Sequence, residues 1–185
     1  MSAPPGRILV MTGDRCACIK LIGKANCNCS PEFKALLEDL WKRGCLHFTL
    51  DLTDCVFMDS TFLGMLAWSG LKVNEPSPDK IERRLELYNP SETIADLIES
   101  LGVIQLFEVT HGQAISMKGA SEMTLPPPTS EACKRASFEA HKLLSGLNKE
   151  NADKFKDVLA YLADDLKKFK SGGEPDGKTR PPSGN

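Results

Sequence analysis

Residues 48–66, FTLDLTDCVFMDSTFLGML, decide the fold of this chain. The start of this stretch places an apolar residue at every second position: Phe48, Leu50 and Leu52. This period of two predicts a strand with one buried face. A short polar turn is expected next, followed by a second apolar run that ends at Asp59 and Ser60.

A helix is expected directly after that run. The apolar and small residues beyond Ser60 follow the spacing of one helix face: Leu63, Leu66, Ala67, Gly70 and Leu71. Asp59 or Ser60 can cap this helix, because a short side-chain oxygen can accept a hydrogen bond from a free amide of the first turn. The helix then begins at an accessible hydroxyl. A phosphate there would be stabilised by the helix dipole and the unpaired amides.

The end of this stretch, residues 56–64, resembles the phosphorylation motif of STAS domains of the anti-sigma factor antagonist (anti-anti-sigma factor) family. In that family an apolar strand is followed by Asp-Ser-Ser/Thr-Gly-Leu-Gly, and a partner anti-sigma kinase phosphorylates the serine. The resemblance implies that Ser60 is the phosphoacceptor, with Asp59 beside it and Gly64 as the second glycine. Phe62 stands where the family has its first glycine.

Two further landmarks of the family follow in the same order. Residues 85–90 are similar to its Leu-x-Leu-x-x-Pro entry into a helix, and residues 101–107 are similar to its closing Leu-Gly segment. The resemblance covers about residues 7–110 and implies an α/β fold, a STAS-like mixed β-sheet with helices packed mainly on one face. The alternation of strand and helix patterns after an N-terminal hairpin favours the same architecture.

The remaining elements are expected from periodicity and from turn residues. Besides the strand and helix of 48–66, strands are expected at 7–12, 16–22, 83–88 and 104–109, and helices at 30–44 and 89–101. Residues 23–29 are expected to form a loop.

The chain divides into four expected segments: a STAS domain at 7–110, a linker at 111–129, a helical extension at 130–170 and a disordered tail at 171–185. The linker ends in a stiff proline run, and the tail consists of Gly, Pro and charged residues. Two apolar stripes predict a C-terminal helical hairpin in the extension. These stripes pack on the sheet or on each other, or they form a dimer or capture a partner through residues 155–169.

Ser60 has two interpretations, as a helix cap or as a phosphoacceptor. A phosphoserine adds about −1.5 to −2 charges beside Asp59, so it would repel acidic or apolar partner groups at that surface. Phosphorylation would then release a partner. Thr61 is the second candidate acceptor, and its simpler role is that of another capping residue.

Two departures from the family concern the partner surface. Phe62 either packs into the core or serves as an exposed aromatic anchor for a partner. In the resemblance, Asn26 stands where the loop of residues 23–28 has an aspartate, so the charge presented to a partner differs. The residues assigned to partner binding are Asn26, Asp59, Ser60, Thr61, Phe62 and Gly64.

Composition excludes several other classes of protein. The chain has 185 residues, 41% of them hydrophobic, and a net charge of −2, which argues against a general binder of nucleic acid or of anionic membranes. No run of about 20 apolar residues predicts a membrane span, and the N-terminus lacks the pattern of a signal peptide. A cytoplasmic protein is therefore expected.

The seven cysteines are expected to be reduced in that compartment. Cys16 and Cys18, with Cys27 and Cys29, form two pairs that resemble halves of a zinc site, but zinc pairs usually have spacers of about two to four residues. We expect ordinary thiols, with no metal and no cofactor. No nucleophile motif accompanies the three histidines His47, His111 and His141, so no enzyme is expected.

The leading hypothesis is a regulatory protein-binding module, an anti-sigma factor antagonist whose binding to an anti-sigma factor or related serine/threonine switch kinase is controlled by phosphorylation of Ser60. The alternative is a STAS scaffold, or an accessory subunit of a transport complex, without a phosphorylation switch.

Overall fold

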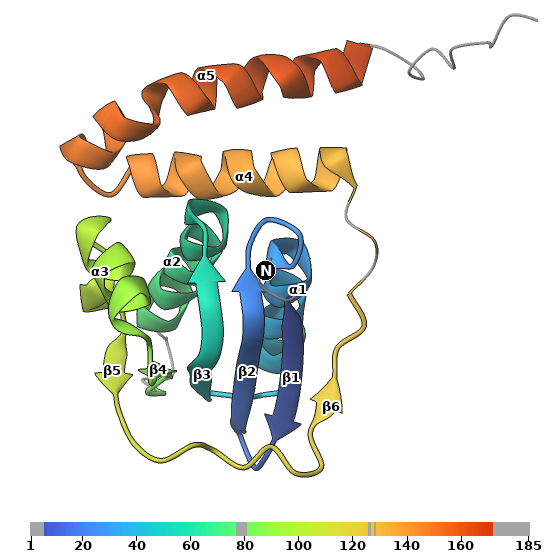
Figure 1. The fold of residues 1–185 in the computed structure, drawn as a ribbon, viewed down its shortest axis with the longest axis vertical. Helices are drawn as coiled ribbons and strands as arrows, with labels where there is room; N and C mark the ends of the chain where they lie inside the picture. The colour runs from blue at the N-terminus through green and yellow to red at the C-terminus, as the bar shows by residue number, and fades with distance from the viewer. Residues whose placement is uncertain (1–5, 77–80, 126, 128, 172–185) are drawn as a thin grey trace, which may run out of the picture.

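A computed structural model describes residues 6–76, 81–125, 127 and 129–171 of the chain. Its strands form one mixed sheet in the order β5-β4-β3-β2-β1-β6 (Figure 1). The strands are β1 (Arg7–Thr12), β2 (Cys16–Ala25), β3 (His47–Met58), β4 (Arg84–Tyr88), β5 (Glu108–Thr110) and β6 (Ser121–Glu122). The helices are α1 (Ser30–Lys42), α2 (Ser60–Asn74), α3 (Glu92–Ser100), α4 (Ser130–Ser145) and α5 (Lys149–Ser171), with a 3-10 turn at Ile104–Leu106.

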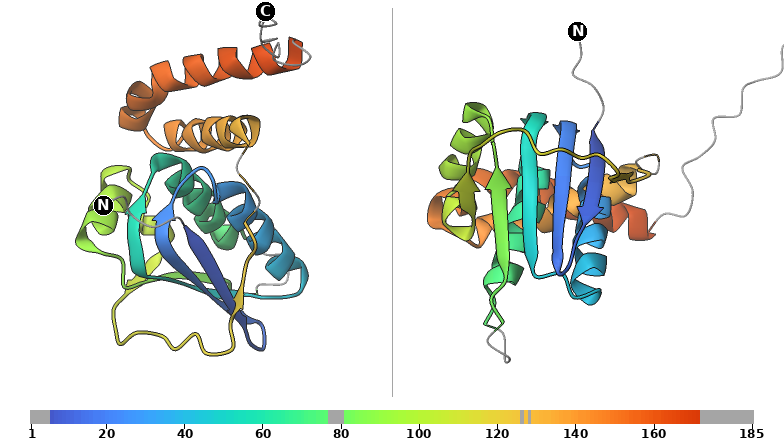
Figure 2. Two further views of the ribbon diagram at one scale, coloured as in Figure 1. Left: turned by 45° about the vertical axis from the view of Figure 1, so that its right-hand side comes forward. Right: turned by 90° about the horizontal axis from the view of Figure 1, so that it is seen from below.

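The sheet combines a hairpin with a parallel half. β1 and β2 pair antiparallel, as expected for the N-terminal hairpin. The pairs β2–β3, β3–β4 and β4–β5 are parallel. Helices α1 and α2 cover one face of the sheet, while residues 111–120 cross the other face (Figure 2). On that second face the Cys18 sulfur lies 3.8 Å from the Met117 sulfur. The predicted α/β class, with helices mainly on one face, is confirmed.

The C-terminal helices pair with each other at one end of the sheet. Helix α4 lies across the end where β3 finishes and α2 begins, and α5 packs on its outer side (Figures 1 and 2). The predicted hairpin is confirmed, because α4 packs on α5; its other main contact is α2 and not a sheet face. In α5, Phe155 and Leu162 are buried within the chain, so much of the stripe considered for dimerisation is already covered.

Several predicted boundaries are wrong for identifiable reasons. β3 runs without a break to Met58, so no turn divides it, and two irregularities in its pairing with β2 accommodate the polar residues there. β2 continues through Gly23, at a φ of 77°, into the expected loop. The expected last strand is a 3-10 turn followed by the short β5. Within the expected linker, β6 pairs with β1.

Parts of other predictions fall outside the described residues. These are the N-terminal residues 1–5, the loop residues 77–80, the prolines at 126 and 128, and the tail from 172 to 185, which was expected to be disordered. Among the helices that the structure does describe, none is both long enough and apolar enough to cross a membrane.

The aromatic residue of the motif belongs to the core. Phe62 is 0% exposed, and its ring centroid lies 4.8 Å from that of Phe33 on α1. The interpretation of Phe62 as an exposed partner anchor is therefore wrong for this conformation. The reason is the helical period, which turns the third residue of α2 inward towards α1.

Replacing Phe62 by alanine is expected to lower the free energy of unfolding by about 3–5 kcal/mol, because it removes a buried ring and leaves a cavity. The matched control is Phe57→Ala on β3, whose side chain is 47% exposed. That change is expected to cost less than about 1 kcal/mol. Denaturant unfolding of both variants measures the difference, and equal losses would contradict the assignment of Phe62 to the core.

Candidate functional site

The site is built at the corner between β3 and α2, where one carboxylate joins three segments. Asp59 caps α2, as expected, and its Oδ1 accepts a hydrogen bond from the Phe62 amide at 2.8 Å. Its Oδ2 accepts a bond from the Cys27 amide at 3.2 Å, and its own amide donates to the Ala25 carbonyl at 3.0 Å. Burial raises the pKa of Asp59, while the amide hydrogen bonds oppose that rise.

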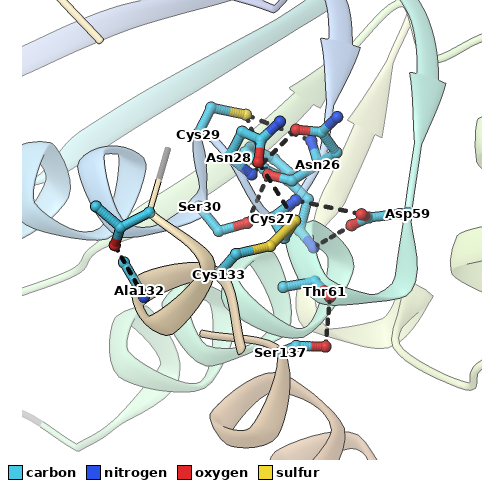
Figure 3. The surroundings of a disulfide bond; sticks show 12 residues. Asn26, Cys27, Asn28, Cys29, Ser30, Asp59, Thr61, Ala132, Cys133 and Ser137 are labelled. Carbon is cyan, nitrogen blue, oxygen red and sulfur yellow. Dashed lines mark hydrogen bonds between the residues drawn. A yellow bond between two sulfur atoms is a disulfide. The ribbon is translucent and has the colours of Figure 1, made fainter. Parts of the chain in front are cut away.

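The loop after β2 is held by its own backbone and by Asn26. The Asn26 Oδ1 accepts a hydrogen bond from the Asn28 amide at 3.1 Å, the pattern of an Asx turn. Its carbonyl accepts from the Ser30 hydroxyl at 2.9 Å at the start of α1. Asn26 therefore shapes the loop that carries Cys27 next to Asp59 (Figure 3). Its role in partner binding stays a prediction.

Ser60 is the first residue of α2, and it faces α4. Its Oγ lies 2.8 Å from Nε2 of His141, and the side chain is only partly exposed. The other ring nitrogen of His141 lies 3.3 Å from the Ser137 hydroxyl, which also accepts a hydrogen bond from Thr61 at 3.1 Å. The ring of Phe155 packs on His141 at 4.8 Å between centroids. The two candidate acceptor hydroxyls thus both contact α4.

Gly64 allows α4 to approach α2 this closely. A Cβ atom on Gly64 would lie 2.5 Å from the Cβ of Ala140 and 2.8 Å from its carbonyl oxygen. Ala140 is fully buried. In this structure Gly64 therefore serves as a helix-packing residue one turn beyond Ser60.

A disulfide joins the loop after β2 to α4. Cys27 is bonded to Cys133, 106 residues further along the chain (Figure 3). The expectation that all cysteines are reduced is therefore wrong, because the fold brings these two side chains together. The bond also removes Cys27 from the zinc pair considered above. Within the described residues, no group of three or more His, Cys, Asp or Glu side chains is placed to hold a metal ion.

Burial also changes the titration of the histidine at this contact. His141 is 6% exposed, and burial lowers its pKa below the ordinary value, while the nearby Asp59 carboxylate works in the opposite direction. A neutral ring accepts a hydrogen bond at one nitrogen and donates at the other, so it can serve both Ser60 and Ser137.

Sequence reasoning missed three residues of this arrangement: Cys133, Ser137 and His141. Their spacing carried a usable signal, because positions 133, 137, 140 and 141 share one face of a helix. The spacing alone does not indicate which part of the protein packs against that helix face. Five of the predicted site residues lie around the corner between β3 and α2: Asn26, Asp59, Ser60, Thr61 and Gly64. The sixth, Phe62, is buried in the core.

Comparison with known proteins gives similarity at the level of structure. No protein-family model matches the chain, and no curated protein sequence matches it. Similar solved structures include the anti-sigma factor antagonist SpoIIAA in its unphosphorylated form, with a TM-score of 0.49 over 57% of this chain and 88% of the other. The Bacillus cell fate determinant SpoIIAA in the phosphorylated form gives a TM-score of 0.47 over 58% and 91%. Sequence identity is 17% in both comparisons, so no residue role is taken from them.

Gly64→Ala is expected to lower the free energy of unfolding by about 1–3 kcal/mol, because the added methyl meets the backbone of Ala140 and overpacks the contact. The control is Gly146→Ala at the end of α4, where the added Cβ would meet only ordinary contacts. Thermal and denaturant unfolding measure both variants. Equal stability of the two variants would contradict the close contact of α2 with α4.

The lowered pKa of His141 predicts that stability falls on acidification. In the unfolded chain a histidine binds a proton at about pH 6.5, whereas native His141 binds one only at a lower pH. The free energy of unfolding is therefore expected to fall as the pH drops from about 8 to about 5.5. His141→Phe should remove part of this dependence, and His47→Gln, at an exposed position, should keep it. An unchanged pH dependence in His141→Phe would contradict the prediction.

Proposed function

We propose that this chain is a regulatory protein-binding module of the anti-sigma factor antagonist type, controlled by phosphorylation of Ser60. The observation that carries the proposal is the place of the Ser60 hydroxyl. It stands at the N-terminus of a 15-residue helix, directly after the capping Asp59, and its partner is a side chain of α4 and not of the sheet domain. A phosphate on this hydroxyl would meet α4 and not the helices that cover the sheet.

The local electrostatics support a switch. The N-terminus of α2 stabilises an added phosphate through the helix dipole. The same phosphate adds about −1.5 to −2 charges next to Asp59, so the surface becomes more acidic. A partner that binds the unphosphorylated surface through acidic or apolar groups is then released.

Thr61 is a weaker candidate for the acceptor. Its side chain is 5% exposed, and its hydroxyl donates to Ser137. Ser60 is more exposed than Thr61 and lies closer to the end of the helix.

The proposed partner is an anti-sigma factor or a related serine/threonine switch kinase in the cytoplasm. Its contact surface would comprise the start of α2, with Asp59, Ser60 and Gly64, and the neighbouring loop at Asn26. Most of this surface faces α4 in the structure, so partner binding requires α4 to move. Phe62 is left out of the surface because it is buried.

One observation favours the alternative, a scaffold or transport-complex subunit without phosphorylation. The hydroxyl of Ser60 is already engaged by His141, and a serine that served only as a polar contact to α4 would look the same. Only a measurement of phosphate on Ser60 separates the two.

The proposal predicts phosphate on Ser60. The full chain is incubated with ATP and a native extract of its source cells, and the peptide that contains residues 59–66 is examined by mass spectrometry. Wild type should gain 80 Da on Ser60, about the mass of one phosphoryl group. Ser60→Ala should lose the modification, and Thr61→Ala should keep it.

Partner capture from the same extract gives the second readout. Ser60→Asp, which mimics the charge, should retain at least about tenfold less of the partner than Ser60→Ala. Absence of phosphate on Ser60, together with equal capture by Ser60→Asp and wild type, would favour the scaffold and reject the proposed switch.

A further inference from the structure

We propose that α4 is a redox-controlled cover over the Ser60 surface, held closed by the Cys27–Cys133 disulfide and released when a protein dithiol reduces that bond. This inference rests on the proposed function, because it assigns a regulation to the Ser60 surface. The opening of α4 itself does not depend on the proposed function, since it can be measured without any phosphorylation.

One face of α4 carries the bonds and the closest packing contact with the site. Cys133 is bonded to Cys27, Ser137 accepts the Thr61 hydrogen bond, Ala140 touches Gly64, and His141 contacts Ser60. These four positions are spaced i, i+4, i+7 and i+8, so they form one stripe on a helix. The stripe runs over the first turns of α2. While the stripe is docked, the partly exposed Ser60 hydroxyl is engaged by His141, and access of a kinase or partner to it is restricted.

The two ends of α4 are held very differently. At its C-terminal end, Leu144 is fully buried in the core cluster. The amide of the Asn151 side chain donates to the carbonyls of Leu101 and Leu144, at 2.9 and 3.1 Å, and fixes the hairpin turn to the end of α3. This end stays attached when the disulfide is reduced.

The N-terminal half of α4 is held to its hairpin partner α5 by the partly buried ion pair of Lys134 with Asp165 at 2.7 Å, and less firmly to the rest of the fold. A groove of about 560 Å³ lies between it and α1, lined by Lys34 and Glu38 on one side and by Arg135 on the other. Just beyond this half, the ion pair between Lys34 and Glu139 spans 3.3 Å and is partly exposed, and solvent-exposed pairs contribute little to stability. The disulfide is the one covalent bond between this half of α4 and the loop after β2. Its loss leaves the Thr61–Ser137 hydrogen bond and the contacts of Ala136 with the rest of the fold. This half, together with the part of α5 that Lys134 holds, can then swing away about the Leu144 end.

The bond lies where a reductant can reach it. Cys27 and Cys133 line a cavity of about 150 Å³ whose rim includes the exposed Asn28 and Thr129. A dithiol protein attacks one sulfur as a thiolate, the other sulfur leaves as a thiolate, and the second thiol of the reductant then displaces the first. The S–S bond gains two electrons and two protons to give two thiols, and the dithiol is oxidised to a disulfide.

A neighbouring thiol does not compete in this exchange. Cys29 is buried two residues from Cys27, and burial raises the pKa of its thiol to about 11. It therefore stays protonated near neutral pH, and a protonated thiol is a poor nucleophile. This favours reversible opening and closing of the same bond over reshuffling.

Hydrogen–deuterium exchange of the full chain tests the inference, with and without dithiothreitol as the dithiol. In the oxidised chain, the amides of residues 130–141 and of residues 60–65 should be protected. Reduction should speed their exchange by about tenfold or more, while the hairpin turn around Asn151 changes little. Cys133→Ser should exchange fast in both conditions. Cys16→Ser, at an exposed free cysteine, should behave like wild type.

Equal exchange of residues 130–141 in oxidised and reduced wild-type chain would overturn the inference, and this comparison needs no substitution. The inference would also be overturned if a non-reducing digest of the oxidised chain contained no disulfide-linked Cys27–Cys133 peptide.

Phosphate transfer in the cell extract gives the separate readout for the proposed function. Faster exchange after reduction with no phosphate on Ser60 in either state supports the cover and rejects the phosphorylation switch. Unchanged exchange with phosphate on Ser60 rejects the cover alone.

Discussion

The Asp59 carboxylate is the interaction on which the rest of the site depends. One oxygen caps α2 through the Phe62 amide, and the other holds the Cys27 amide in the loop after β2. The first bond sets where α2 begins and therefore where Ser60 stands. The second places Cys27 at the same corner, within reach of Cys133. A partly buried carboxylate with several amide donors is a stable arrangement, because hydrogen bonds stabilise its negative charge. The position of α4 therefore depends on the Asp59 cap, because this cap places both Ser60 and Cys27 where α4 contacts them.

The contact between α2 and α4 is built from small and polar side chains. Gly64 and Ala140 bring the two helix backbones close together, and the hydroxyls of Ser60, Thr61 and Ser137 form hydrogen bonds across the gap. Such a surface gains less from the hydrophobic effect than a face of leucines would, since little apolar area is buried per residue. It is also compatible with water when α4 leaves, because hydroxyl groups that lose their partners can bind solvent. This composition is compatible with the proposed opening and closing of α4.

The corner could be predicted from the sequence because its signals are local. The change from a period of two to a helical period, with an aspartate at the junction, gives both the end of β3 and the cap at Asp59. The polar pair Thr53 and Asp54 misled the prediction of a turn, because an irregular strand pairing absorbs such residues without ending the strand. The partners of Ser60 and Cys27 could not be predicted in the same way. They lie 81 and 106 residues away, and an apolar stripe on a helix does not specify which surface will receive it.

Under the proposed function, a phosphate on Ser60 and the helix α4 exclude each other. The Ser60 oxygen lies 2.8 Å from His141, and a phosphorylated oxygen at that distance has no proton to donate and carries three further oxygens that need space. Exclusion is reciprocal, because two events that compete for one surface weaken each other by the same free energy. Opening of α4 therefore promotes phosphorylation, and the phosphate in turn prevents α4 from docking again.

The two proposals together give the chain three states. In the first α4 is closed, in the second α4 is open and the surface can bind a partner, and in the third α4 is open and Ser60 is phosphorylated. Reduction of the disulfide acts on the first step only, and removal of the phosphate acts on the last. Two chemically independent inputs thereby control one surface through the position of a single helix.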